Sequence, residues 1–156
     1  MRILVLSDSH GSKQGILRVI ENQPSANILI HLGDGEKDIS AVKHQYPDKQ
    51  FIQVSGNCDH SPYNCTEKIE MIHDCKIFLC HGHTYHVKSG LEGLVYRAQS
   101  IGCNIALFGH THQPITEYHN GLYLMNPGSI GHGYPKSYGI IDITDQGIIC
   151  NTITLR

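Results

Sequence analysis

Short apolar segments alternate with longer amphipathic ones over the first two thirds of the chain. The first four segments predict a strand, a helix, a strand and a helix over residues 2–7, 15–23, 27–33 and 38–44. The same rhythm then predicts strands over residues 51–56, 76–82 and 104–110 and a helix over residues 90–101. These predicted strands are continuously apolar, which is typical of strands buried on both faces of a largely parallel sheet.

After residue 112 the pattern changes to closely spaced strands, predicted over residues 115–120, 122–126, 138–144 and 147–155. Turn signals such as Asn120-Gly121 and Pro127-Gly128 separate them, so the C-terminal third predicts a β-meander. A parallel α/β part followed by a β part fits an α/β fold in which two sheets stack with helices outside. No linker or change of composition divides the chain, and we expect one domain over residues 1–156.

Composition narrows the functional classes. The formal net charge of −2 offers no basic surface for sequence-independent binding, so we expect no nucleic-acid polymer as a partner. No apolar run approaches the roughly 18 to 20 residues of a membrane span, and the N-terminus does not resemble a signal peptide; we expect a cytoplasmic protein that does not contact membranes. The 6 cysteines form no C-x-x-C pair and are expected to be free thiols.

Histidine is unusually frequent, with 12 residues, as many as lysine and arginine together. Five polar clusters, most of them containing histidine, each follow a predicted strand: Asp8-Ser9-His10, Gly33-Asp34, Gly56-Asn57, His81-Gly82-His83 and Gly109-His110-Thr111-His112. The carboxyl ends of parallel strands lie along one edge of a sheet, which is where ligand sites form. We therefore expect the five clusters to converge.

The side chains of these clusters indicate a metal centre. Carboxylate, imidazole and amide oxygen together are the usual ligands of Mn²⁺, Fe or Zn²⁺. If the backbone is extended, residues two apart point to the same side, so Asp8 with His10, and His110 with His112, would each face one centre. A single cluster of this kind more often serves as a helix cap or lies on the surface. Five such clusters, all at strand ends, favour a metal site. The remaining histidines are assigned no role: His31, His44, His73, His86, His119 and His132.

Taken in order, the five motifs resemble those of the metallophosphoesterase (calcineurin-like) superfamily. They read "DSH" at 8–10, "GD" at 33–34, "GN" at 56–57, "HGH" at 81–83 and "GHTH" at 109–112. The small size, the form "GNCD" at 56–59 and "NPGS" at 126–129 resemble its YfcE-like phosphodiesterase subfamily. The resemblance implies a four-layer αββα sandwich of two mixed sheets flanked by helices.

The same resemblance implies a dinuclear metal centre. One metal would be held by Asp8, His10, Asp34 and His112, and the other by Asp34, Asn57, His81 and His110, with Asp34 bridging. His83 would lie behind these ligands. The cofactors expected are two divalent ions. The absence of a thiolate ligand favours Mn²⁺ or Fe²⁺ over Zn²⁺, Ni²⁺ stays possible, and the resemblance implies Mn²⁺.

The reaction implied is hydrolysis of a small phosphodiester by attack of a metal-bridging hydroxide. Two divalent metals, two aspartates and one hydroxide leave a charge of about +1, which attracts a monoanionic diester. No Gly-x-Ser-x-Gly elbow or P-loop is present to suggest other chemistry. The residues expected to take part in catalysis are Asn57, Cys58, Asp59 and His81.

Cys58 departs from the superfamily pattern. In much of the superfamily a histidine follows the asparagine and is thought to protonate the leaving oxygen, with the next acidic residue orienting it. Here Cys58 and Asp59 take these places, and a thiol is a poorer proton donor than imidazolium. Two interpretations stay open. In the first, Cys58 takes little part, and the leaving group either needs little protonation or is protonated by another group such as His60. In the second, Cys58 donates a proton or packs against the substrate. We do not expect Cys58 to ligate a metal, because neighbours in an extended segment point to opposite sides.

Other functions compete with this reading. A phosphomonoesterase of the same superfamily would need the same metals. A non-catalytic scaffold is the second alternative, because the retromer scaffold subunit resembles this fold; its motifs are degraded, whereas all seven expected ligands are intact here. The resemblance also allows a homodimer or homotetramer.

Overall fold

The apolar segment at the N-terminus forms β1 (Arg2–Leu6), and both faces of this strand are buried. Ile3 and Val5 point into a core between two sheets, whereas Leu4 and Leu6 pack in a second core beneath helices. The continuous apolar run therefore reflects burial on both faces, as the sequence predicted. The computed structural model describes residues 1–60 and 65–156.

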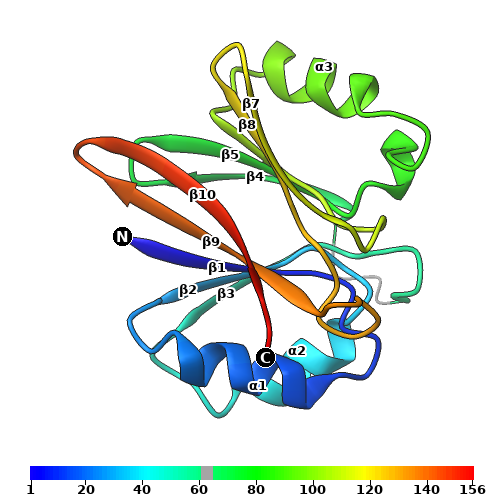
Figure 1. Ribbon diagram of the computed structural model, residues 1–156, viewed down its shortest axis with the longest axis vertical. Helices are drawn as coiled ribbons and strands as arrows, with labels where there is room; N and C mark the ends of the chain where they lie inside the picture. The colour runs from blue at the N-terminus through cyan, green and yellow to red at the C-terminus, as the bar shows by residue number, and fades with distance from the viewer. Residues whose placement is uncertain (61–64) are drawn as a thin grey trace.

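The first sheet has the strand order β10-β9-β1-β2-β3. β2 (Ile28–His31) and β3 (Gln50–Gln53) extend β1 in parallel, and the hairpin β9 (Ser137–Thr144) and β10 (Gly147–Thr154) adds to the other side of β1 in antiparallel fashion. The helices α1 (Lys13–Asn22) and α2 (Glu36–Lys43) connect the parallel strands. They form the bottom layer in Figure 1 and cover the outer face of this sheet.

The second sheet has the order β4-β5-β6-β8-β7. Its centre is parallel, with β5 (Cys75–Cys80), β6 (Ile105–Leu107) and β8 (Leu122–Pro127) side by side. The edge strands β4 (Glu67–Ile72) and β7 (Pro114–His119) pair antiparallel with their neighbours. A short 3₁₀ helix, η1 (His83–Tyr85), and α3 (Glu92–Ser100) follow β5, and α3 forms the top layer in Figure 1.

Three apolar clusters separate the four layers. One lies between the two sheets, one between the first sheet and α1 with α2, and one between the second sheet and α3. The order helix, sheet, sheet, helix is visible in Figure 1. The expected αββα sandwich of two mixed sheets is therefore confirmed.

Two expectations for the strands are wrong. β4 has no counterpart among the predicted strands, because its segment "EKIEMI" at 67–72 mixes charged and apolar residues, as suits a half-exposed edge strand. The predicted meander is two separate hairpins that belong to different sheets, since β8 pairs with β6 and β9 pairs with β1. The chain between β8 and β9 crosses from one sheet to the other.

His31 is a buried histidine at the end of β2 that the sequence left without a role. Its Nδ1 accepts a hydrogen bond from the Gly33 N–H at 3.3 Å, and its Nε2 has no hydrogen-bond partner among the described residues. Burial lowers the pKa of His31 from 6.5 to about 4. The side chain is therefore neutral at neutral pH and belongs to the packing beneath the β2–α2 connection.

All six cysteines are free, and four of them are buried, in agreement with the sequence.

Within residues 1–60 and 65–156, no helix is long and apolar enough to cross a membrane.

We expect the Phe78→Ala variant to lower the free energy of unfolding by about 3–5 kcal/mol, because it leaves a cavity between β5 and α3. Phe78 is fully buried and meets the Tyr85 ring edge-on at 5.8 Å between centroids. Urea denaturation measures the change. Tyr96→Ala on α3 is the matched control, since Tyr96 is 76% exposed and its loss should cost at most about 0.5 kcal/mol. An equal decrease in the free energy of unfolding in both variants would contradict the packing of Phe78 between β5 and α3.

We expect His31 to make the protein less stable as the pH falls from about 6.5 to about 4. In this window the unfolded chain binds a proton at His31 and the folded chain does not, so protonation favours unfolding. His31→Asn removes this contribution, so the difference in unfolding free energy between wild type and variant should change across the window. The exposed His44, changed to Asn, is the control. Parallel stability curves for wild type and His31→Asn would exclude the effect.

Candidate metal centre

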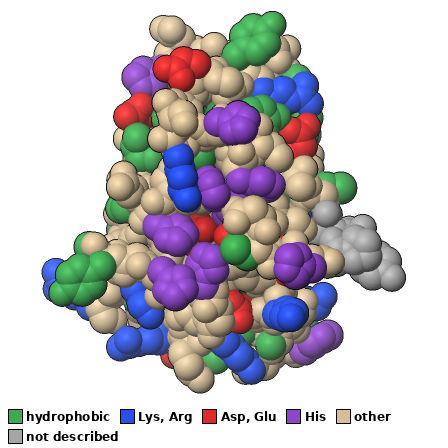
Figure 2. Space-filling model, turned by 90° about the vertical axis from the view of Figure 1, so that its right-hand side faces the viewer, with side chains coloured by type: hydrophobic (Ala, Val, Ile, Leu, Met, Phe, Trp, Pro, Cys, Tyr) green, Lys and Arg blue, Asp and Glu red, His purple; other side chains and the backbone are tan. Residues whose placement is uncertain are grey.

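The loops that follow β1, β2, β3, β5 and β6 meet at one edge of the sandwich. Backbone hydrogen bonds tie them together: Asp8 N–H donates to Gly33 O at 3.0 Å, and Gly109 N–H donates to His81 O at 2.9 Å. Figure 2 shows histidine side chains gathered on this face with acidic groups visible between them. The sequence clusters therefore converge as expected.

The backbone at this edge is strained where the expected ligands lie. Five of them have a positive φ: Asp8, His10, Asp34, His110 and His112, with angles between 42° and 67°. Residues other than glycine seldom adopt this left-handed conformation, and it costs on the order of 1–3 kcal/mol each. Gly33 shares it at 101°, and a Cβ there would lie 2.5 Å from the Gly56 nitrogen. The close contact of these two glycine loops brings Asp34 and Asn57 together.

Asp8 is fully buried, and its two oxygens have different surroundings. Oδ2 accepts hydrogen bonds from the Ser7 hydroxyl at 2.5 Å and from the His110 N–H at 3.1 Å. Oδ1 faces imidazole nitrogens, with His112 Nε2 at 3.1 Å and His10 Nε2 at 3.7 Å. One oxygen is thus held by the protein, and the other is directed into the centre.

Asp34 repeats this arrangement. Its Oδ1 accepts the Cys58 backbone N–H at 2.7 Å, and its Oδ2 lies 3.5 Å from His81 Nε2 and 3.7 Å from His10 Nε2. Burial opposes ionisation of this carboxyl, but contact with His81 in its protonated form and the backbone N–H of Cys58 outweigh burial, so the pKa of Asp34 lies well below its usual range. Asp34 is therefore an anion at neutral pH.

The surroundings of the buried His81 fit a cation. Its Nδ1 lies 2.8 Å from the Leu32 carbonyl oxygen, which only accepts, so this nitrogen carries the proton. Its Nε2 then presents a lone pair to oxygens of Asn57 at 3.1 Å and Asp34 at 3.5 Å. A positive charge between these atoms, either a proton or a metal ion, relieves the repulsion. A backbone carbonyl bound to the far nitrogen is also how metal-ligating histidines are usually oriented.

Among the described residues, donor atoms gather within 4.8 Å of one another in three groups. Asp8, His10 and His112 form the first, Asp8, Asp34 and His81 the second, and His10, Asp34 and Cys58 the third. Asp8 takes part in the first two, which the sequence did not anticipate. His110 joins none of the three groups, although its ring lies 5.0 Å from that of His81. Burial and the nearby His81 lower the pKa of His110, which keeps its imidazole neutral.

Two arguments about side-chain direction are wrong in detail. Asp8 with His10, and His110 with His112, approach a common centre through left-handed turns and not through an extended backbone. Cys58 was expected to point away from the metals, yet its thiol lies within 4.8 Å of donor atoms of His10 and Asp34. The reason is that Asn57 and Cys58 sit in a turn, where side chains of neighbours need not oppose. Burial, followed by the Asp34 carboxylate, raises the pKa of Cys58.

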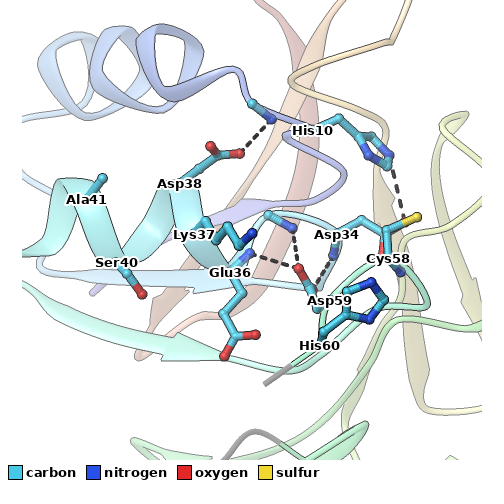
Figure 3. A pocket seen from close by; sticks show the side chains of 12 residues that line it. His10, Asp34, Glu36, Lys37, Asp38, Ser40, Ala41, Cys58, Asp59 and His60 are labelled. Atoms are coloured by element: carbon cyan, nitrogen blue, oxygen red, sulfur yellow. Dashed lines mark hydrogen bonds and ion pairs between the residues drawn. The ribbon is translucent and has the colours of Figure 1, made fainter. Parts of the chain in front are cut away.

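Asp59 joins two loops around the centre, the one after β2 and the one after β3. Its carboxylate accepts four backbone N–H groups, from Asp34 at 2.7 Å, Gly56 at 2.9 Å, and Gly35 and Glu36 at 3.0 Å each. Figure 3 shows it directed at the N-terminus of α2, where a negative charge is favourable. These bonds indicate that Asp59 acts through the backbone, and the role of orienting a proton donor that the resemblance implied stays a prediction.

A cavity of about 860 Å³ opens beside the centre on the α2 side. The expected ligands His10 and Asp34 line this cavity together with Cys58. His60 lies across from α2 (Figure 3). The cavity leaves room for a ligand to reach the centre from this side.

The structure adds one histidine that the sequence missed. The ring of His132 lies 4.8 Å from that of His10 and stacks on His112 at 6.4 Å between centroids. Its loop is fixed to β1, because Gly131 N–H donates to Asp8 O at 3.1 Å. The Gly- and Pro-rich composition of residues 126–137 was the only signal for this loop. The ring of His83 lies 5.4 Å from that of His81, and its place behind the ligands stays a prediction.

We expect Asp59→Ala to weaken Mn²⁺ binding by roughly 10- to 100-fold and to lower the free energy of unfolding of the metal-free protein by about 1–3 kcal/mol. Both effects follow from freeing four backbone N–H groups that fix Asp34 and Gly56. Isothermal titration calorimetry and urea denaturation measure them. Asp74→Ala is the control, because the Asp74 side chain is fully exposed. If the two variants bind Mn²⁺ alike, Asp59 does not position the ligands.

Comparison with known proteins agrees with the geometry. Residues 1–146 match the calcineurin-like phosphoesterase superfamily domain. The chain is 31% identical to the phosphodiesterase YfcE of Escherichia coli strain K12, and the match covers 96% of each protein. A predicted phosphoesterase from Streptococcus pneumoniae superposes with a TM-score of 0.81 at 26% identity over 98% of this chain and 88% of that one.

A solved protein of a different name has the same fold. Vps29 of Entamoeba histolytica, solved with Zn²⁺, superposes with a TM-score of 0.75 at 20% identity over 99% of each chain. This likeness concerns the fold alone. The domain match and the similarity to YfcE cover most or all of the sequence, and the chain belongs to the calcineurin-like phosphoesterase superfamily.

Proposed function

We propose that this phosphoesterase is a dinuclear metal-dependent phosphodiesterase that hydrolyses small phosphodiesters. The observation that carries the proposal is the placement of Asp8 and Asp34. Each carboxylate has one oxygen fixed by the protein and one oxygen turned toward imidazole nitrogens of the same centre. Such paired, preformed acceptors are suited to divalent cations that bind phosphate esters.

The proposed ligands divide between two cations. Asp8, His10, Asp34 and His112 would hold the first, and Asp34, Asn57, His81 and His110 the second. Oxygen and imidazole donors favour Mn²⁺ or Fe²⁺ over softer metals, and Cys58 adds one soft donor at the edge of the set. When bound, two divalent ions supply an activated water and positive charge for the phosphate oxygens.

The protein residues supply orientation and charge balance. The Leu32 carbonyl fixes the ring of His81, and the backbone N–H groups of Cys58 and His110 fix the two carboxylates. Two carboxylates neutralise only half of the charge of two divalent ions. The remaining positive charge favours an anionic phosphate ester over a neutral ester.

Cys58 distinguishes this site from one with a histidine at the same place. Its thiol has a raised pKa and lines the open cavity. It therefore meets the substrate as a neutral group, and we propose that it packs against the substrate and contributes little to protonation of the leaving oxygen. Asn57 and His81 act as ligands, and Asp59 acts through the backbone.

The rivals are a phosphomonoesterase and a scaffold without catalysis. A phosphodiester carries one negative charge and a monoester up to two, and the same cations attract both. The name phosphodiesterase YfcE, given to a relative that is matched over 96% of each protein, supports the diester. Against the scaffold stands the intact set of Asp8, His10, Asp34, Asn57, His81, His110 and His112.

We expect the protein with Mn²⁺ to hydrolyse bis-p-nitrophenyl phosphate faster than p-nitrophenyl phosphate, with two Mn²⁺ bound per chain. Asp34→Ala should reduce the diester rate by about 100-fold or more, because it removes the shared ligand. The exposed Asp48, changed to Ala, should leave the rate unchanged. A faster monoester reaction would favour the phosphomonoesterase. Binding of Mn²⁺ without turnover of either ester would favour the scaffold.

A further inference from the structure

A second cavity lies on the opposite side of the metal centre, between η1 with the start of α3 and the start of β7. Its volume is about 470 Å³, within the range of roughly 300–1,000 Å³ that is usual for small-molecule pockets. The floor is formed by the buried Val87 and Phe108, and Leu91 and Ile115 form the walls. Lys88 and Thr111 bring polar groups to the lining.

This apolar cavity is continuous with the metal centre along the chain and in space. Thr111 stands between His110 and His112, and its hydroxyl accepts a hydrogen bond from the Asn126 side chain at 3.0 Å. On the other wall, Val87 N–H donates to the carbonyl of Gly82, the residue between His81 and His83. The cavity is therefore anchored to both histidine motifs.

The two sides of the centre differ in chemistry. The larger cavity on the α2 side is lined by the carboxylates of Glu36, Asp38 and Asp59 and also by Lys37. The smaller cavity has mainly apolar side chains and one cation, Lys88, and no carboxylate. The charge of Lys88 also acts on His110, so this ammonium lies close enough to influence the centre.

We propose that the smaller cavity is a specificity pocket that binds an apolar arm of the substrate, of the size of an aromatic ring, while the phosphate lies at the metals. This inference rests on the proposed function. A phosphodiester has two arms, and this cavity, which has no carboxylate among its described lining residues, would bury an apolar arm. The ammonium group of Lys88 would attract an anionic phosphate that approaches through the smaller cavity. The carboxylates on the α2 side would instead favour arms that carry polar or hydroxyl groups.

The size of the expected effect follows from burial of the arm. Placing even one methylene-sized group in an apolar pocket changes binding by roughly 10-fold or more. A phenyl group in this cavity should therefore improve binding at least about 10-fold over a methyl group attached to the same anion.

The test compares methylphosphonate and phenylphosphonate, which carry the same anionic group and are not hydrolysed by this reaction. Their binding to the Mn²⁺-loaded protein is measured by isothermal titration calorimetry. We expect phenylphosphonate to bind at least about 10-fold more tightly. Leu91→Ser and Ile115→Ser should each reduce this preference toward 1 and leave the affinity for methylphosphonate unchanged. Ile149→Ser on β10, where the side chain is 55% exposed, is the control and should keep the preference.

The outcomes separate the inference from the proposed function. Equal affinity for the two phosphonates, in a protein that hydrolyses bis-p-nitrophenyl phosphate, would overturn the pocket and leave the function standing. A phenyl preference that survives both serine variants, with their folding checked by circular dichroism, would also overturn it. Absence of both hydrolysis and phosphonate binding would overturn the two proposals together.

Discussion

Two buried carboxylates, Asp8 and Asp34, impose the electrostatic constraint on which the rest of the site depends. Anionic groups that share a buried site are costly unless positive charge or donors compensate them. One oxygen of each is satisfied by donors from the protein, and the other faces histidine nitrogens. Because His81 already donates through Nδ1 to a carbonyl, its other nitrogen cannot compensate as a neutral group. A proton on that nitrogen or a cation from outside the chain therefore has to compensate the two carboxylates, and the pKa of His81 is raised despite its burial.

The backbone around these carboxylates is held in an unfavourable conformation by the surrounding fold. Asp8, Asp34 and three histidines have left-handed φ angles, each of which costs on the order of 1–3 kcal/mol. Packed sheets on both sides and hydrogen bonds between the loops offset this cost. Asp59 accepts four N–H groups from loops that follow two different strands. The ligands are consequently positioned before any metal binds, which favours binding because little ordering remains.

The convergence of the five motifs could be predicted because each follows an apolar strand, and strand ends share an edge. The local directions could not. An extended backbone was assumed for Asp8 to His10 and for Asn57 to Cys58, but close contact between Gly33 and Gly56 requires turns there. The approach of His132 to His10 depends on a chain crossing between the sheets over more than 100 residues. β4 was missed because half of its side chains face solvent, which weakens the apolar pattern.

Selection among phosphate esters, on the proposed function, has to come from groups outside the motifs. The metals and their ligands attract the phosphate group that every candidate substrate contains. The two flanks of the centre differ, since Glu36 and Asp38 line one cavity and Leu91 and Ile115 line the other. An unsymmetrical diester can satisfy both flanks at once, whereas a monoester has a single arm and can use only one. On the proposed function, the two flanks therefore suit a diester, because each of its two arms can contact one of them.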